Sequence, residues 1–183
     1  MKLMHKKIIY VDVDGVMADT LTGIIDEYNR IMGTNRRPEE VYRWHFYRCF
    51  GHTEEEGFEI LTKIFSKKGF WLNLEPKPDA AEVLRLLNEK YQVYICTAPF
   101  ACENCIPEKI QWLNKYFPFI KYEQLIFITA KGLLKGDYMI DDRPSSLRSF
   151  SGTGMLFKTH ANRYYNAFER TFENWNQIKD FLI

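Results

Sequence analysis

Five short runs of apolar residues punctuate the chain, and each is rich in β-branched or aromatic side chains. Runs of this length and composition are typical of buried strands. The segments between them carry apolar residues at the spacing of a helix that lies on a sheet. This alternation predicts an α/β fold with a mostly parallel five-stranded sheet and helices on both faces. The predicted strands are 7–11, 92–96, 124–128, 138–140 and 154–157.

The segment 80–90 shows the clearest helical pattern, because its apolar residues form one stripe. Asp79 and Glu82 have capping-box spacing, and Pro76 and Pro78 prevent the helix from extending towards the N-terminus. We therefore expect Asp79 to cap this helix. Similar stripes predict helices over 108–116 and 172–182.

The interval 21–74 breaks the alternation, because it has helix-like periodicity and no convincing strand. The simplest interpretation is a small helical cap inserted after the first strand. We therefore predict a core formed by residues 1–20 and 75–183 and a cap formed by residues 21–74. Asp19 is expected to cap the helix that enters the insert.

Composition narrows the class of protein. The chain has 183 residues and a net charge of +1, so no overall field favours nucleic acid or an anionic membrane. No window approaches the length of a membrane span, and the N-terminus lacks the apolar region of a signal peptide. Four cysteines in a chain of this length do not form the pattern of a disulfide framework. We expect a soluble, cytoplasmic protein with a small-molecule ligand.

Four aspartates directly follow two of the predicted strands. Ligand sites in open α/β sheets lie outside the carboxyl ends of the strands, so these carboxylates would meet at one edge. Such a group repels strongly unless a cation is bound, and Mg²⁺ prefers oxygen ligands. A single aspartate there commonly caps a turn, but two pairs favour a metal site. Gly15 permits a sharp turn or a close backbone approach beside them. The four are Asp12, Asp14, Asp141 and Asp142.

Two further polar residues lie near the same predicted edge. Thr97 ends the second apolar run, and Lys131 follows the third. A hydroxyl and an ammonium there would suit the non-bridging oxygens of a phosphate. Lys135 is an alternative to Lys131.

In this order, Asp12-Val-Asp14-Gly-Val, Thr97, Lys131 and Asp141-Asp142 resemble the four motifs of the haloacid dehalogenase-like (HAD) phosphohydrolases. The resemblance implies a Rossmann-like HAD core with a cap. Longer stretches between about residues 8 and 144 resemble the 5'(3')-deoxyribonucleotidase family. They read VDVDGVMAD, GFWLNLEPKP, ICTAP, CIPEKIQWL and MIDDRP.

The resemblance implies a role for each motif residue. Asp12 corresponds to the nucleophile that forms an aspartyl-phosphate, and Asp14 to the general acid and base. Mg²⁺ would be held by Asp12, the main-chain carbonyl of Asp14 and Asp142, with Asp141 supporting Asp142. Lys131 stands ten residues before Asp141, as the motif lysine of the family does. Thr97 and Lys131 would complete the catalytic set by binding the phosphate.

The resemblance also implies a substrate, because the family removes phosphate from deoxyribonucleoside monophosphates such as dUMP and dTMP. Phe70 and Trp71 match the aromatic residues that stack on the base, although hinge packing between cap and core is an alternative. The insert offers Trp44, with Phe46 and Tyr47 as further candidates. The other predicted substrate-binding residues are Thr97, Ala98, Lys109 and Arg143.

Two departures from the family pattern concern the substrate. Thr20 stands where the family commonly has an aromatic residue, and Asp79 stands where it has a glycine after Pro-x-Pro. Two alternatives therefore remain open beside the nucleotidase. One is a phosphatase for another small phosphomonoester, such as a sugar phosphate. The other is a non-catalytic protein that binds a phosphate or a nucleotide.

The Cys102-x-x-Cys105 pair has the spacing of half a zinc site or of a redox pair. Cys49, His45 and His52 could complete a zinc site only if the insert folded onto that loop. The remaining interpretation is a pair of ordinary loop cysteines near the entrance of the site.

Overall fold

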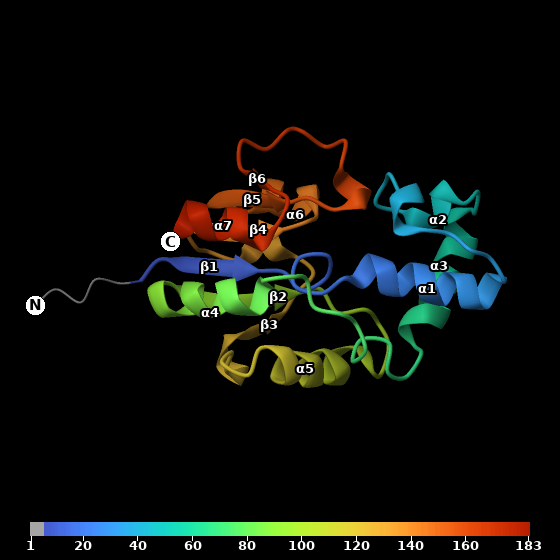
Figure 1. Ribbon diagram of the computed structural model, residues 1–183, viewed down its shortest axis with the longest axis horizontal. Helices are drawn as coiled ribbons and strands as arrows, with labels where there is room; N and C mark the ends of the chain where they lie inside the picture. Colours follow the sequence, from blue (N-terminus) through green and yellow to red (C-terminus); the bar gives the residue numbers. More distant parts are fainter. Residues whose placement is uncertain (1–5) are drawn as a thin grey trace, which may run out of the picture.

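The computed structural model describes residues 6–183, which form a parallel sheet of six strands in the order β3-β2-β1-β4-β5-β6 (Figure 1). All five predicted strands are present, but the predicted strand count is wrong. The extra strand has two residues, too few for a periodic signal in the sequence. Residues 1–5 of the predicted core lie outside the described residues. The strands are β1 Ile8–Val11, β2 Gln92–Thr97, β3 Leu125–Phe127, β4 Tyr138–Asp141, β5 Thr153–Phe157 and β6 Thr171–Phe172.

The register of the sheet brings three carboxyl ends to one edge. Val11 of β1 is level with Ile95 of β2 on one side and with Ile140 of β4 on the other. All of these pairings are parallel, so the residues that follow β1, β2 and β4 emerge next to one another. The central strands β1, β2 and β4 therefore place the predicted site residues at the same edge of the sheet.

Helices cover both faces of the sheet, as the alternating pattern predicts. On one face, α4 and α7 pack against each other and, with α5, contribute to the larger apolar cluster. On the other face, Leu147 of α6 packs with Tyr10, Met139 and Leu156 from the strands. These helices are α4 Ala80–Lys90, α5 Cys105–Tyr116, α6 Pro144–Ser149 and α7 Trp175–Leu182.

The cap lies beyond the carboxyl edge of the sheet and, between residues 21 and 74, contains helices and no strand (Figure 1). The chain enters the cap after Ala18 and leaves it before Pro76, and these two residues form an isolated antiparallel bridge. Apolar side chains of the cap belong to the same cluster as those under the sheet. The domain boundaries at residues 20 and 75 stay a prediction. The cap helices are α1 Thr20–Met32, η1 Pro38–Glu40, α2 Phe46–Cys49 and α3 Glu54–Phe65.

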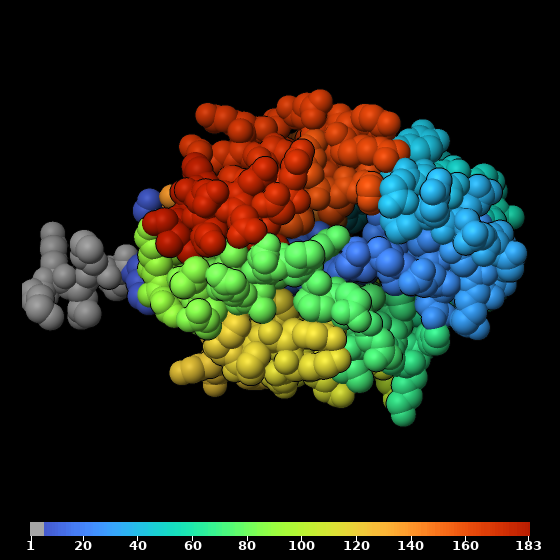
Figure 2. All heavy atoms as spheres, viewed as in Figure 1, coloured from blue at the N-terminus to red at the C-terminus, as the bar shows by residue number. Residues whose placement is uncertain are grey.

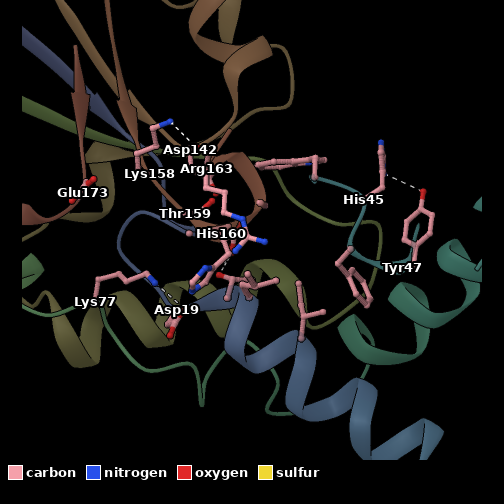
Figure 3. A pocket seen from close by; sticks show the side chains of 18 of the residues that line it. Asp19, His45, Tyr47, Lys77, Asp142, Lys158, Thr159, His160, Arg163 and Glu173 are labelled. Carbon is pink, nitrogen blue, oxygen red and sulfur yellow. Dashed lines mark hydrogen bonds and ion pairs between the residues drawn. The ribbon is translucent and has the colours of Figure 1, made fainter. Parts of the chain in front are cut away.

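A cavity of about 670 Å³ separates the cap from the sheet edge (Figure 3). One wall carries Trp44, Phe46 and Tyr47 from the cap. The opposite wall is formed by the segment after β5, which includes the short helix η4 His160–Asn162. That segment meets the cap in the space-filling view (Figure 2). Its Arg163 donates a hydrogen bond to the carbonyl of Glu39.

Three local predictions need correction. Asp79 occupies the N-cap position of α4, but its side chain makes no capping hydrogen bond, because its backbone is left-handed (φ 63°). Its carboxylate instead accepts a hydrogen bond from Asn176. Asp19 likewise sits at the N-cap of α1 without capping the backbone, and its carboxylate binds Thr22 and Lys77. The helix predicted over 172–182 starts only at Trp175, where the Asn174 side chain caps it.

In the described part of the chain, no helix has the length and apolar character needed to cross a membrane.

Candidate active site

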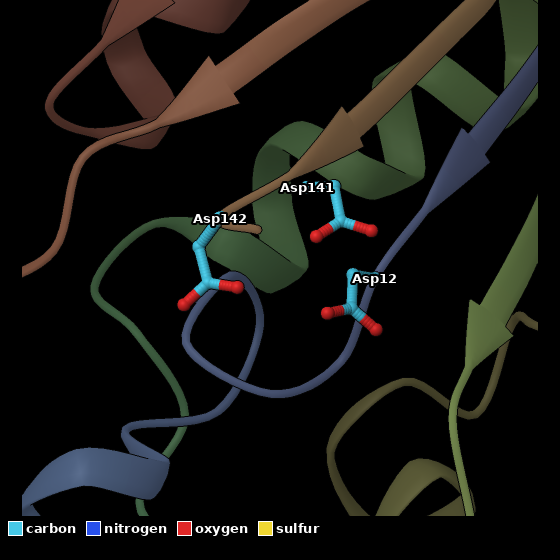
Figure 4. A group of neighbouring side chains, drawn as sticks. All are labelled: Asp12, Asp141 and Asp142. Carbon is cyan, nitrogen blue, oxygen red and sulfur yellow. The ribbon is translucent and has the colours of Figure 1, made fainter. Parts of the chain in front are cut away.

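Three carboxylates converge at the edge where β1 and β4 end (Figure 4). Asp12 follows β1, Asp141 is the last residue of β4, and Asp142 comes next. All three side chains are buried, and each places an oxygen within 4.8 Å of the others. The close parallel pairing of β1 with β4 therefore brings together three of the four carboxylates expected at this edge, and Asp14 is not part of this group.

Lys131 provides the positive charge next to this group. Its Nζ lies 2.8 Å from Asp12 Oδ1 and 2.6 Å from Asp141 Oδ2, and its side chain is buried. Although burial opposes the charged form, Asp12 and Asp141 raise the pKa of Lys131 above its usual value. Lys135, the alternative, is exposed.

The three carboxylates differ in how fully they are satisfied. Asp141 accepts hydrogen bonds from Lys131 on one oxygen and from the Arg143 backbone on the other, at 2.6 and 2.7 Å. Asp12 Oδ1 pairs only with Lys131, at 2.8 Å, and Asp142 Oδ1 is buried without a hydrogen-bond partner. An unsatisfied buried carboxylate oxygen of this kind fits a bound cation. The geometry thus gives Asp141 a supporting position and leaves Asp142, beside Asp12, open towards a metal.

The electrostatics of the group also fit a cation. Burial raises the pKa of Asp12 to about 7, and Asp141 and Asp14 add to this effect, although Lys131 opposes it. Burial, with Asp141 and Asp12, likewise raises the pKa of Asp142 well above its usual value. A divalent cation would offset both the burial and the repulsion that raise these two pKa values.

Gly15 allows Asp142 to reach this position. Its backbone is left-handed (φ 74°), and a Cβ at this residue would lie 2.2 Å from Asp142 Oδ2. Only glycine combines this conformation with this close approach. The close backbone approach expected of Gly15 therefore occurs against Asp142.

Asp14 lies outside the acidic cluster and is held by three side chains. Thr20 donates a hydrogen bond to Oδ1 at 3.0 Å, and Thr97 and Lys109 both bind Oδ2. Lys109 is buried, bonds to Thr97 at 2.8 Å and lies 4.5 Å from the ring centre of Trp71. Asp14, Thr97 and Lys109 thus form one connected polar group beside the acidic cluster.

Phe70 and Trp71 do not line the cavity. Both are buried, at 6% and 3% exposure, and pack against Phe65, while the Trp71 indole donates to the Phe65 carbonyl. The position of these two side chains therefore corresponds to hinge packing. Trp44, by contrast, lines the cavity and is 42% exposed.

The other predicted residues lie at the margin of the site. Ala98 follows β2 but does not line the cavity. Arg143 is exposed, and its guanidinium lies 5.5 Å from the ring centre of Trp44.

Three residues that position the site are absent from the sequence-based prediction. Glu108 accepts hydrogen bonds from the backbone of Gly69 and Trp71, and so fixes Trp71 over Lys109. Asn162 donates to the carbonyls of Asp142 and Phe157 at 2.7 and 2.9 Å. Thr20 binds Asp14. Two sequence signals could have revealed members of this set: the charged Glu108 inside a helical apolar pattern, and Thr20 at the position where the resembling family commonly has an aromatic residue.

The described cysteines and histidines, all within residues 6–183, form no group of metal ligands. Within residues 6–183, the acidic cluster is the one group of potential metal ligands with three or more members. Cys102 donates to the carbonyl of Phe65, Cys105 is buried, and both are free thiols. His45 and His52 bind tyrosine hydroxyls within the cap.

Solved structures with the same architecture define the class of protein. A HAD-like hydrolase from Streptococcus pneumoniae aligns with a TM-score of 0.67 at 10% identity, covering 97% of this chain and 99% of that one. A HAD-family hydrolase from Bacillus subtilis, solved with magnesium, aligns with a TM-score of 0.62 at 11% identity, covering 97% and 99%. The protein therefore has the HAD-like fold.

Sequence comparison defines the family more narrowly. Residues 6–183 match the family described as "5' nucleotidase, deoxy (Pyrimidine), cytosolic type C protein", and the chain belongs to this family. A Staphylococcus epidermidis protein, provisionally named 5'(3')-deoxyribonucleotidase, is 32% identical, covering 98% of this chain and 97% of that protein. The 5'(3')-deoxyribonucleotidase of Bacillus subtilis is 29% identical, covering 97% and 99%. The protein is thus a phosphatase of the 5'-nucleotidase class.

Proposed function

We propose that this protein is a Mg²⁺-dependent phosphomonoesterase that acts on deoxyribonucleoside monophosphates of the dUMP and dTMP type. The observation that carries the proposal is the environment of Asp12. Its carboxylate pairs with Lys131 and has an oxygen within 4.8 Å of Asp142, which lines a cavity with an aromatic wall. The names of the relatives support the same class of substrate.

Asp12, Asp142 and the main-chain carbonyl of Asp14 would hold the metal, while Asp141 orients Lys131. When bound, Mg²⁺ supplies charge neutralisation for the carboxylates and the phosphate. Lys131 favours the ionised form of Asp12 and orients it towards the reacting phosphorus. The Thr97 hydroxyl and Lys109 are placed to bind the other phosphate oxygens.

In the first chemical step, an Asp12 oxygen forms a bond to phosphorus as the bond from phosphorus to the ester oxygen breaks. Asp14 donates its proton to that ester oxygen, so the nucleoside leaves as a neutral alcohol. Lys109 and Thr97 both bind Asp14 before substrate arrives. Entry of the phosphate redirects these donors to its oxygens and frees Asp14 to carry a proton.

In the second step, Asp14 removes a proton from water, and the water oxygen attacks the phosphorus of the aspartyl-phosphate. The bond between phosphorus and Asp12 breaks, which releases inorganic phosphate and restores the Asp12 carboxylate. Two carboxylates separated in this way can divide nucleophilic and proton-transfer roles.

The cap supplies the surface for the rest of the substrate. Trp44, Phe46 and Tyr47 line the cavity opposite the carboxylates, and a base can stack on exposed aromatic rings. We assign the contact with the base to Trp44, because it lines the cavity and is exposed. Phe46 and Tyr47 line the cavity but are buried, whereas Phe70 and Trp71 are buried and do not line it.

A panel of phosphomonoesters tests the proposal. Wild-type protein is assayed for phosphate release from deoxynucleotides with each base and with 5' or 3' phosphates, and from sugar phosphates, with Mg²⁺ and with a chelator. We expect turnover of dUMP and dTMP that requires Mg²⁺ and is abolished by Asp12→Asn. Good activity on sugar phosphates with none on dUMP or dTMP would contradict the assigned substrate. Turnover by Asp12→Asn would contradict the covalent mechanism.

Trp44→Ala tests the base contact separately. We expect it to raise KM for dTMP by about tenfold, which corresponds to the ~1–3 kcal/mol of one stacked base, and to leave ribose 5-phosphate unaffected. Phe58→Ala is the matched control, because Phe58 is an exposed aromatic residue of the cap that does not line the cavity. Equal changes in the two variants would remove Trp44 from the base contact.

A further inference from the structure

A second cavity, of about 480 Å³, lies on the other side of Trp44 from the active-site cavity. Trp44 and Ala161 line both cavities, so they form part of the partition between them. The second cavity is lined mainly by arginine and aromatic side chains, and none of its lining residues is acidic. These are Arg43, Arg143 and Arg148 together with Tyr42, Trp44, Tyr164 and Tyr165.

The three arginines lack the partners that usually neutralise such a group. Among the residues that the structure describes, no carboxylate forms an ion pair with Arg43, Arg143 or Arg148. Each guanidinium instead lies against a ring. The distances to the ring centres are 4.8 Å for Arg43 on Tyr42, 5.5 Å for Arg143 on Trp44 and 5.0 Å for Arg148 on Tyr165.

This arrangement leaves binding capacity of two kinds. A guanidinium that stacks on a ring still has free N–H groups along the edge of its own plane. Two of these N–H groups can donate hydrogen bonds to two oxygens of one phosphate. Rings with an open face can also stack on a nucleobase. Tyr164 is 74% exposed and Tyr42 is 41% exposed, so both offer such a surface.

We propose that this second cavity is a nucleotide-binding site separate from the active site, and that its ligand is a nucleoside triphosphate. Three guanidinium groups around one cavity suit several phosphates better than one, and the tyrosines suit the base. The volume falls within the range of small-molecule sites. No part of this assignment depends on which monophosphate the active site hydrolyses.

The second cavity also shares a residue with the hydrogen bonds that position the active site. Asn162 lines it, and the same side chain donates to the carbonyl of Asp142. A ligand in this cavity would therefore contact two residues, Trp44 and Asn162, that also shape the active site.

The test measures dTTP binding by calorimetry to the full chain with excess Mg²⁺ and with inorganic phosphate saturating the active site. We expect one dTTP site, with Kd raised about tenfold or more by Arg148→Gln and by Arg43→Gln, because each loses a charge-assisted hydrogen bond to phosphate. Arg85→Gln is the matched control, since Arg85 is exposed on α4 and pairs with Glu89. Phosphatase activity of Arg148→Gln should equal that of wild type, which verifies folding.

Three results would overturn the proposal. The first is an equal Kd for dTTP in Arg148→Gln and Arg85→Gln. The second is complete displacement of dTTP by the monophosphate substrate, which would place dTTP in the active site. The third is equal affinity of the wild-type protein for dTTP and tripolyphosphate, which would exclude recognition of the base. We expect Tyr164→Ala to weaken the binding of dTTP but not that of tripolyphosphate.

Discussion

Replacing Asp12 by asparagine should make the metal-free protein more stable. The carboxylate is buried beside Asp141 and Asp142, and its pKa rises from the ordinary 3.8 to about 7. An acid with a raised pKa in the folded state destabilises that state once the pH exceeds the unfolded value, and the full cost is reached above the folded value. Lys131 keeps Asp141 as its partner in the variant, so no unpaired ammonium is created.

The size of the effect follows from the two pKa values. The difference between a pKa of 3.8 and one of about 7 corresponds to roughly 4 kcal/mol of unfolding free energy at pH 8. At pH 5.5, which lies between the two pKa values, it corresponds to roughly 2 kcal/mol. The advantage of Asp12→Asn over wild type should therefore about double between these two pH values. Saturating Mg²⁺ should stabilise wild type more than the variant and so reduce the advantage.

Urea unfolding followed by tryptophan fluorescence, in a chelator at pH 5.5 and at pH 8, measures these differences. Asp26→Asn is the control, because Asp26 is an exposed carboxylate on α1. It should shift stability little at either pH. An Asp12→Asn protein that is no more stable than wild type at pH 8, or whose advantage does not grow with pH, would refute the electrostatic account of the cluster.

Two further predictions concern backbone conformation. Gly15→Ala should abolish stabilisation by Mg²⁺ in a thermal-shift titration, because its Cβ would meet Asp142 Oδ2 at 2.2 Å. Gly33 has a similar φ of 65° with open space around it, so Gly33→Ala is the control. This variant should lose about 1–2 kcal/mol of unfolding free energy and keep its stabilisation by Mg²⁺. The same response to Mg²⁺ in both variants would contradict the contact with Asp142. At position 79, where φ is 63°, Asp79→Gly should be about 1 kcal/mol more stable than Asp79→Ala in urea unfolding, since both lose the bond to Asn176. Equal stabilities would show that the left-handed backbone carries no cost there.

The sheet and the convergence of the carboxylates could be predicted because they depend on local pattern and on one geometric rule. Parallel strands carry their carboxyl ends to one edge, so aspartates after β1 and β4 must meet there. The roles assigned to Asp12, Asp14 and Lys131 remain predictions that the kinetic tests address.

Burial of aromatic side chains could not be predicted in the same way. Phe70 and Trp71 match a family position for base recognition, yet Trp71 packs on Phe65 and covers Lys109. Whether an aromatic residue faces a cavity or a core depends on contacts distant in sequence, such as the hydrogen bonds from Gly69 and Trp71 to Glu108. Strand β6 was not predicted for a different reason. It has two residues, which are too few to show the alternation of apolar and polar positions of a strand.

The bridge between Ala18 and Pro76, where the chain enters and leaves the cap, has a consequence for how this architecture can vary. Because the chain leaves and rejoins the core at adjacent points, the insert 21–74 is connected to it as a surface loop would be. The carboxylates and Lys131 lie on the core side of this bridge, whereas the aromatic wall belongs to the insert. Changes around Trp44, Phe46 and Tyr47 can therefore alter the cavity wall without moving the carboxylates. Gly69 and Trp71 have to be kept, because they contact Glu108 and Lys109.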